Sequence, residues 1–157
     1  MSFSFLDEAP SLGAFRILTV CTGNICRSPL AESLLRKELV GLPVELLSAG
    51  TRALVDDSMP PQMQTIALNL DVSDAAKHRS RQLTRTHIRF ADLVLALDRG
   101  HRRAVVEMVP RASRYTFTLR EFARLGNNVP DRDLALPEGK LLVEHLRNAV
   151  EAAAQLR

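Results

Sequence analysis

Both cysteines of this 157-residue chain fall in one short stretch that also contains an arginine and a serine. The stretch reads VCTGNICRSPLAE over residues 20–32, and its cysteines are Cys21 and Cys26. Residues of these types, this close together, could form a disulfide, hold a metal ion or present a reactive thiolate. Each of the three possibilities requires different features in the rest of the chain.

A disulfide or a metal site fits the stretch poorly. A bond between Cys21 and Cys26 would close a very small loop, and the thiols of a cytoplasmic chain stay reduced. A zinc site needs about four ligands, and these two thiols are the only nearby candidates. We therefore expect neither a structural disulfide nor a bound metal.

A reactive thiolate fits the spacing well. Five residues separate Cys21 from Arg27, and a helix-like pattern begins just beyond. A loop that ends on a helix N-terminus can turn its backbone N–H groups inward and bind an anion. The same positive field, together with Arg27, favours the thiolate form of Cys21. The planar guanidinium of Arg27 also matches two oxygens of a phosphoryl group.

Two small residues of the stretch suit a tight loop. Gly23 is predicted to let the backbone turn tightly, because glycine tolerates positive φ. Asn24 can also enter the left-handed region, and its side chain can hydrogen-bond to neighbouring segments. Together with the thiol and the arginine, these residues predict a phosphate-binding loop that carries a nucleophile.

Regular elements must hold this loop, and apolar periodicity indicates where they lie. Strands are predicted at residues 16–20, 44–47, 91–97 and 115–118, with a loop at 48–51. Helices are predicted at residues 29–40, 60–70, 100–109 and 119–125 and from about 140 to the C-terminus, after a loop at 126–139. Strands that alternate with helices favour one α/β domain whose parallel sheet is covered on both faces. Ligands bind at the carboxyl ends of such strands, where the cysteine loop falls.

Length and composition agree with a single small domain. Residues 16–157 form the predicted domain, and residues 1–15 are expected to be a loosely attached N-terminal extension. No apolar run reaches the roughly 18 residues of a membrane span, and the first residues do not resemble a secretory signal. We therefore expect a cytoplasmic protein with no membrane partner.

The net charge of +3 and the pI of about 9.3 are only mildly basic. The positive residues gather at 77–89 and 99–103, where they are expected to be mainly solvated surface that can also attract anionic substrates or partners. One tyrosine and no tryptophan offer little stacking surface for bases. No nucleic-acid partner is expected.

The stretch VCTGNICRSPLAE resembles the signature loop of the low-molecular-weight protein tyrosine phosphatases. The resemblance continues in order through LSAGT at 47–51, KHRSRQLT at 77–84, ADLVLALD at 91–98 and Val129-Pro130-Asp131, and it covers about residues 16–157. It implies a four-stranded parallel sheet flanked by helices on both faces, with the phosphate-binding loop after the first strand.

The resemblance also implies roles for individual residues. Cys21 would attack phosphorus and form a phosphocysteine intermediate, Arg27 and the loop amides would bind the phosphoryl oxygens, and Asp131 would act as general acid and then base. Ser28 would hydrogen-bond the thiolate, and Asn24, Ser48 and His78 would fix the loop. The implied phosphate-binding residues are Thr22, Gly23, Asn24, Ile25, Cys26, Arg27 and Ser28. No metal or other cofactor is implied.

The sequence departs from the family at the expected mouth of the site. Arg132-Asp133-Leu134 follows Asp131 where the family has proline and aromatics, and Leu54 stands where an aromatic is usual. The resemblance implies a phosphatase that acts on a phosphorylated protein, at phosphotyrosine, or on a small phosphomonoester such as an aryl phosphate. Two other readings stay open: a phosphate-binding module with weak or no turnover, and a single-cysteine arsenate reductase that uses a small thiol.

The remaining titratable residues receive minor roles or none. Asp92 and Asp98 flank a predicted strand and are expected to cap or form local ion pairs. His87, His101 and His145 have no motif partner, so no role is assigned to them. A reactive Cys21 next to Cys26 also predicts sensitivity to oxidation.

Overall fold

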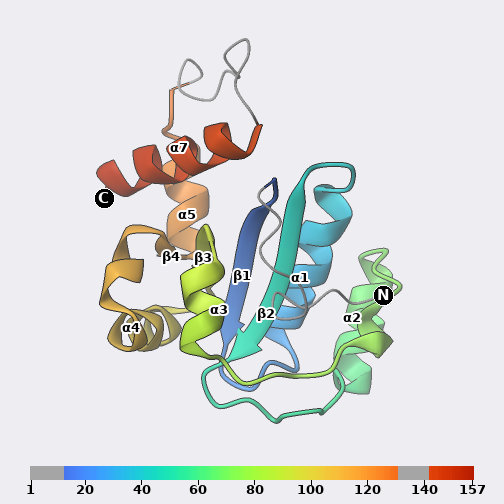
Figure 1. Cartoon of the computed structure of the whole chain (residues 1–157). Helices are drawn as coiled ribbons and strands as arrows, with labels where there is room; N and C mark the ends of the chain where they lie inside the picture. Colours follow the sequence, from blue (N-terminus) through green and yellow to red (C-terminus); the bar gives the residue numbers. More distant parts are fainter. Residues whose placement is uncertain (1–12, 131–141) are drawn as a thin grey trace.

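A four-stranded parallel sheet forms the centre of the protein, as the sequence predicts. The computed structural model describes residues 13–130 and 142–157. The sheet has the order β2-β1-β3-β4 (Figure 1). Its strands are β1 (Phe15–Cys21), β2 (Val44–Gly50), β3 (Leu93–Ala96) and β4 (Thr116–Thr118).

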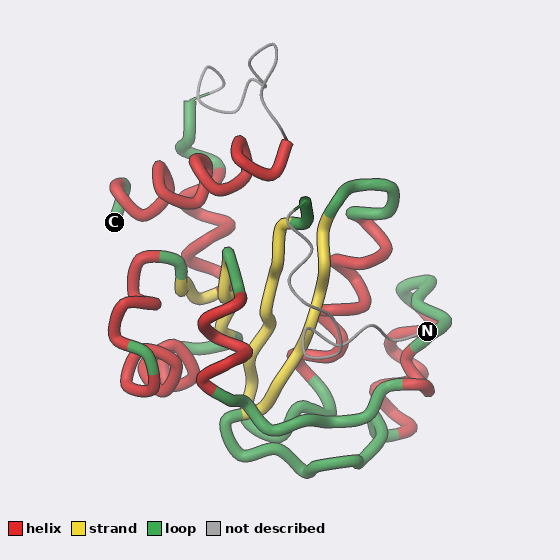
Figure 2. Tube along the Cα trace, in the orientation of Figure 1, coloured by secondary structure: helices red, strands yellow, loops and turns green. Residues whose placement is uncertain are grey.

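Helices cover both faces of the sheet, and their chain order alternates with the strands (Figure 2). They are α1 (Arg27–Glu38), α2 (Pro61–Asn69), α3 (Arg85–Phe90), α4 (Arg99–Met108), α5 (Leu119–Gly126) and α7 (Leu142–Gln155), with the 3₁₀ helices η1 (Ala75–Lys77) and η2 (Pro110–Arg114). No helix among the described residues is long and apolar enough to cross a bilayer.

Alternate residues of β1 feed two separate hydrophobic cores, because successive side chains of a strand point to opposite faces. Leu18 and Val20 pack with residues of α3 and α4, including Ile88 and Val105. Ile17 packs with α5 and α7 on the opposite face. Every residue of β1 is buried, so the strand places its last residue, Cys21, at a fixed point on the carboxyl edge of the sheet.

The structure corrects two predicted boundaries and adds one helix. Residues 48–50, predicted to be a loop, continue β2, because they pair with residues 19–21 of β1 and are fully buried. Helix α1 begins at Arg27, two residues before the predicted start. Helix α3 was not predicted, and a capping box formed by Thr84 and His87 fixes its N-terminus. The start of the last helix near residue 140 and most of the predicted extension, residues 1–12, lie outside the described residues.

Candidate active site

The loop between β1 and α1 lies at the carboxyl edge of the sheet. Cys21 is the last residue of β1 and is 3% exposed, and Arg27 is the first residue of α1. The first N–H groups of a helix have no partner within the helix and carry the positive end of its dipole. The N-terminus of α1 therefore faces the loop that begins at the Cys21 thiol.

Four consecutive carbonyl groups of this loop are bound by segments outside it. The carbonyls of Cys21, Thr22, Gly23 and Asn24 accept hydrogen bonds of 2.6 to 3.0 Å from the main-chain N–H groups of Thr51, Arg52 and Leu54 and from the Nε2 of His78, in that order. The carbonyl and the N–H of a trans peptide point in opposite directions. The N–H groups of residues 22–25 are therefore directed away from these outer segments.

The contact of one of these N–H groups shows that it points toward the Cys21 thiol. The N–H of Asn24 points to the Sγ of Cys21 at 3.3 Å. A concave row of N–H groups around a thiol is an arrangement that binds an anion and stabilises a thiolate. Because the carbonyls point outward, the N–H groups of residues 22–25 form the inner surface of the loop.

Asn24, rather than Gly23, makes the tight turn. Asn24 has φ of 56°, whereas Gly23 is not among the glycines with positive φ in the described chain. The fully buried Asn24 side chain offsets this strained backbone, since its Nδ2 donates to Ser28 and to Ser48 at 2.9 Å each. Its Oδ1 accepts from the N–H of Arg81 at 2.8 Å. Gly23 therefore does not use the positive φ that glycine tolerates.

The hydrogen-bond directions converge on the thiol. The Oγ of Ser28 lies 2.9 Å from the Sγ of Cys21 and accepts a hydrogen bond from the Asn24 amide. Because that amide group can only donate, the Ser28 hydroxyl proton remains free to point at sulfur. Ser28 is fully buried, so water does not compete for this proton. Both the Ser28 hydroxyl and the Asn24 N–H are thus placed to donate to the Cys21 sulfur.

His78 holds the loop from outside. A carbonyl can only accept, so the Nε2 of His78 carries the proton that it shares with the Asn24 oxygen at 2.6 Å. Burial lowers the pKa of His78, against the opposing effects of that hydrogen bond and of Glu32. The imidazole is therefore neutral at neutral pH. The structure brings Asn24, Ser28, Ser48 and His78 into one hydrogen-bonded network.

Arg27 lies at the far end of the loop and forms an ion pair with Asp98 at 3.2 Å. Both side chains are about half exposed, so the pair contributes little to stability. Burial raises the pKa of Asp98, but the hydrogen bond from the His101 N–H and the charges of His101 and Arg27 outweigh it and lower the pKa. Asp98 also caps α4, and Asp92 pairs with Arg147 at 2.8 Å. The local roles expected for both aspartates are confirmed.

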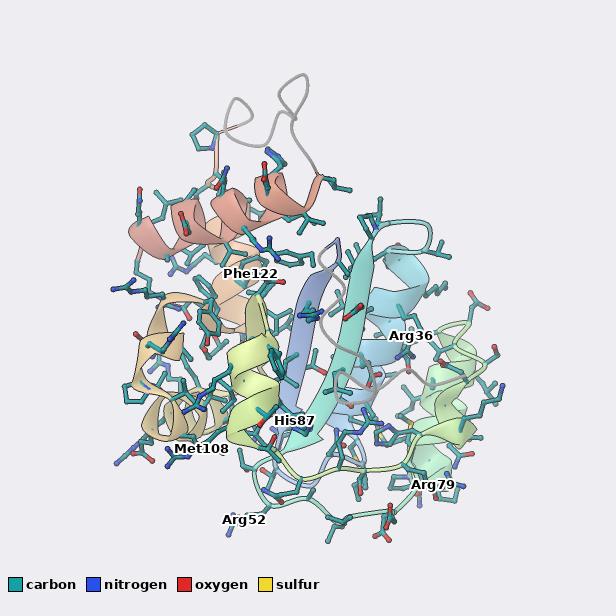
Figure 3. All side chains as sticks on the ribbon, in the orientation of Figure 1. Arg36, Arg52, Arg79, His87, Met108 and Phe122 are labelled. Carbon is teal, nitrogen blue, oxygen red and sulfur yellow. The ribbon has the colours of Figure 1, made fainter. Side chains whose placement is uncertain are left out.

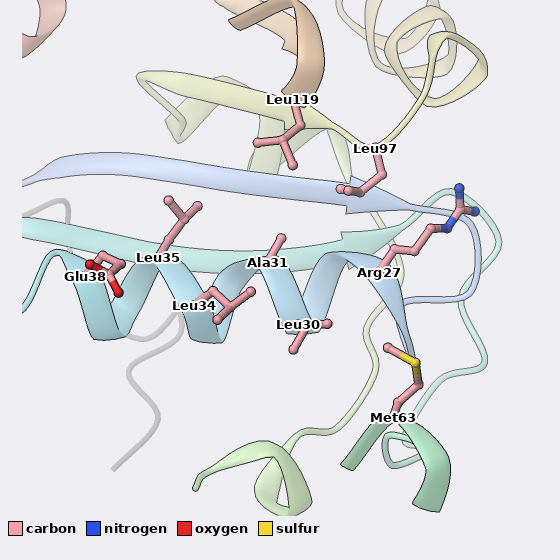
Figure 4. A pocket seen from close by; sticks show the side chains of 9 residues that line it. All are labelled: Arg27, Leu30, Ala31, Leu34, Leu35, Glu38, Met63, Leu97 and Leu119. Carbon is pink, nitrogen blue, oxygen red and sulfur yellow. The ribbon is translucent and has the colours of Figure 1, made fainter. Parts of the chain in front are cut away.

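Two arginines and an apolar pocket lie near the loop. Arg52 and Arg79 project at this end of the molecule, on the segments that follow β2 and η1 (Figure 3). An apolar pocket of about 410 Å³ lies along α1 beside Arg27 (Figure 4). Its walls include Leu30, Leu34, Met63, Leu97 and Leu119. Arg27 is the only predicted phosphate-binding residue in this pocket, which is therefore distinct from the anion loop.

Sequence reasoning missed Gly50 as a functional residue. Gly50 ends β2 directly opposite Cys21. A Cβ at Gly50 would lie 2.4 Å from the carbonyl oxygen of Thr22 and 3.0 Å from the nitrogen of Asn24. Both atoms are backbone of the phosphate loop, so they cannot rotate aside as a side chain would.

Substitution of Gly50 by alanine is therefore expected to displace the loop. We expect kcat/KM for an aryl phosphate to fall at least about tenfold, because misplacing reacting groups by about 1 Å can cost 10²-fold. Gly126→Ala is the matched control, since a Cβ there meets nothing within 4 Å. Equal kcat/KM in the two variants would show that the close approach of Gly50 does not shape the loop.

Sequence reasoning also missed His101, whose Nε2 lies 2.8 Å from the Oγ1 of Thr22 in the loop. Asp131, the predicted general acid, lies outside the described residues, as do Arg132 and Asp133. Within residues 13–130 and 142–157, no group of three or more His, Cys, Asp or Glu side chains could hold a metal ion.

The fold and the loop agree with the comparisons to known proteins. Residues 16–155 match the family described as low molecular weight phosphotyrosine protein phosphatase. The chain belongs to this family.

Its relatives include phosphatases of two named specificities. A protein-arginine-phosphatase of Geobacillus stearothermophilus is 41% identical over 126 residues, or 80% of each chain. The low molecular weight protein-tyrosine-phosphatase Etp of Escherichia coli K12 is 35% identical, covering 88% of this chain and 89% of its own. The structure of Vibrio vulnificus Wzb in complex with benzylphosphonate superposes with a TM-score of 0.62 and 30% identity, covering 92% of this chain and 97% of Wzb.

Proposed function

We propose that this phosphatase hydrolyses phosphotyrosine in proteins, and small aryl phosphates, through a phosphocysteine intermediate on Cys21. One observation carries the proposal: the Cys21 thiol lies 2.9 Å from the Ser28 hydroxyl and 3.3 Å from the Asn24 N–H, inside a loop whose carbonyls are all turned outward up to Asn24. This environment suits a nucleophilic thiolate and binds the anion that it must attack.

In the first step, the Cys21 thiolate attacks phosphorus and the bond from phosphorus to the leaving oxygen breaks. Asp131 donates a proton to that oxygen as it departs. The loop N–H groups and the Arg27 guanidinium bind the phosphoryl oxygens, where negative charge is spread in the transition state. Arg27 can turn from Asp98 to the substrate at little cost, because their exposed ion pair is weak.

In the second step, water attacks phosphorus and the phosphorus–sulfur bond breaks. Asp131 accepts the proton from this water, and inorganic phosphate and the Cys21 thiolate are released. The Ser28 hydroxyl hydrogen-bonds the departing sulfur, which makes the thiolate a better leaving group. The reaction needs neither a metal ion nor an electron donor.

Phosphoarginine in proteins is a second candidate substrate. The relative at 41% identity is named a protein-arginine-phosphatase. The loop binds the phosphoryl group, which both substrates share, so the difference must arise from contacts with the leaving group. Benzylphosphonate in the Vibrio relative has a benzyl group beside a phosphonate, and this favours the aryl substrate.

A substrate panel tests the proposal on the full chain. We expect hydrolysis of para-nitrophenyl phosphate and of a phosphotyrosine peptide in the presence of EDTA, with much slower release of phosphate from the same peptide carrying phosphoserine. Faster release from the phosphoarginine peptide would favour the second candidate. Phosphate binding without turnover would instead support a binding module, and consumption of arsenate with added thiol would support a reductase.

Reversible inactivation by peroxide is a further expected property. Burial, and then the nearby Cys21, raise the pKa of Cys26, so this neighbour remains a thiol while Cys21 reacts. Peroxide would convert the Cys21 thiolate to a sulfenic acid, which condenses with the Cys26 thiol to a disulfide and water. Dithiothreitol should then restore activity. Peroxide-treated protein that dithiothreitol rescues in neither the wild type nor Cys26→Ala would contradict this prediction.

A further inference from the structure

We infer that His101 is a positioning residue that fixes the first peptide of the phosphate loop through Thr22. The inference rests on the proposed function, since it concerns how the same loop binds its anion. His101 lies in the first turn of α4 and is 5% exposed. Its Nε2 lies 2.8 Å from the Oγ1 of Thr22, the residue directly after Cys21.

The N-terminus of α4 engages both ends of the loop. Asp98 caps this helix by accepting a hydrogen bond from the His101 N–H at 2.9 Å. The other oxygen of Asp98 pairs with Arg27, the arginine of the loop motif. His101 binds Thr22 at the opposite end. One turn of α4 therefore contacts the residue that follows the thiol and the residue that would clasp the phosphoryl oxygens.

The His101 ring is neutral, and its Nε2 hydrogen-bonds to the Thr22 hydroxyl. Burial lowers the pKa of His101; Asp98 raises it and Arg27 lowers it further, and these two are the charges that act on the ring within the described residues. The ring is therefore neutral at neutral pH and holds one proton. Its Nδ1 lies 3.2 Å from Asp98 but makes no hydrogen bond among the described residues. The hydrogen bond between Nε2 and the Thr22 hydroxyl is therefore the contact that ties the ring to the loop.

This hydrogen bond limits the rotation of Thr22. The Thr22 carbonyl is held by the Arg52 N–H at 3.0 Å, and its side chain is held by His101. Two fixed points on one residue set the orientation of the adjoining peptides, whose N–H groups face the thiol side of the loop. Without His101, the carbonyl contact alone would hold this residue, and both the anion affinity and the reactivity of Cys21 should change.

The experiment measures the alkylation of Cys21 by iodoacetamide, resolved from Cys26 by mass spectrometry of peptides, and its protection by inorganic phosphate. Loss of this partly buried hydrogen bond in His101→Leu should weaken phosphate protection about tenfold and shift the pH dependence of alkylation upward. His101→Gln keeps an amide near the position of Nε2, so it should stay within about threefold of the wild type.

Two comparisons separate positioning from general stability. His87 is a buried histidine whose pKa is likewise lowered by burial, but its side chain caps α3. His87→Gln should leave phosphate protection unchanged even if the melting temperature falls. Thr22→Val should reproduce the effect of His101→Leu, and the double variant should be no weaker than either single one, because both remove the same hydrogen bond.

The inference would be overturned if His101→Leu showed the same phosphate protection and the same pH dependence of alkylation as the wild type. Additive losses of phosphate protection in the double variant would also overturn it. If His101→Leu fails to fold, full phosphate protection in Thr22→Val would overturn it. If the wild type binds phosphate but hydrolyses no phosphomonoester, while His101→Leu still weakens binding, the proposed function fails and the positioning role stands. If phosphate does not protect Cys21 in the wild type, both fail.

Discussion

Replacing Cys21 by serine is expected to lower kcat for para-nitrophenyl phosphate by about 10⁴-fold or more. A serine hydroxyl stays protonated near neutral pH, and the described groups that hydrogen-bond Cys21, the Ser28 hydroxyl and the Asn24 N–H, are not bases that could remove its proton. The loop, in contrast, is held by main-chain hydrogen bonds and by the Asn24 network, neither of which uses the sulfur as its anchor. The fold and the affinity for inorganic phosphate should therefore survive.

Steady-state kinetics and a phosphate titration by calorimetry check the two halves of this expectation. Unchanged turnover in Cys21→Ser would refute a nucleophilic role for Cys21. Loss of both turnover and phosphate affinity would mean that the thiolate itself organises the loop. Arg27→Lys should be severe as well, and it should weaken phosphate affinity, because an ammonium replaces the planar fork by a point charge.

Asp131→Asn is expected to slow hydrolysis of phenyl phosphate by roughly 10²–10⁴-fold, the usual contribution of a general acid. Phenolate, whose conjugate acid has a pKa of about 10, needs protonation as it leaves. The nitrophenolate ion is a better leaving group, so para-nitrophenyl phosphate should be affected much less. The ratio of kcat values for the two substrates is the measurement that reports on the acid.

Asp133→Asn is the matched control, because it removes the other carboxylate of the same segment. We expect Asp133 to face the entrance from its position in the sequence pattern, so its replacement should leave kcat nearly intact and, if anything, lower KM, because a carboxylate in that position would repel anionic substrates. The opposite behaviour of the two variants would shift the assigned acid by two residues. If neither variant changes the rate, the chain lacks an acid here, and the binding-module reading gains support.

Local sequence patterns predicted the parallel sheet and the phosphate loop for clear physical reasons. The buried strand β1 is mainly apolar, and the residues after it combine turn formers with a helix start. Asn24, Ser28, Ser48 and His78 were assigned through the family resemblance, and the structure places all four in contact. Composition misassigned residues 48–50 as a loop, because small residues in a buried strand have the composition of a turn.

Gly50 and His101 escaped notice because their importance depends on the register of distant segments. Nothing near Gly50 in sequence reveals that the register of β1 and β2 brings it against the Thr22 carbonyl. His101 stands 79 residues from Thr22, and it meets the loop only because β3 lies beside β1 and delivers α4 to the same edge. The contacts of Gly50 and of His101 with the loop can be predicted only when the order and register of the strands are known.

The outward carbonyls of the phosphate loop also bear on how substrate preference could change during evolution. Arg52 and Leu54 hold the loop with their main-chain N–H groups, which every residue except proline supplies. Their side chains are exposed, with Leu54 at 51%. Selection can therefore alter these side chains while the anion-binding geometry stays intact. Chemistry and recognition are encoded in different atoms of the same residues, so new phosphorylated targets can be acquired without rebuilding the catalytic loop.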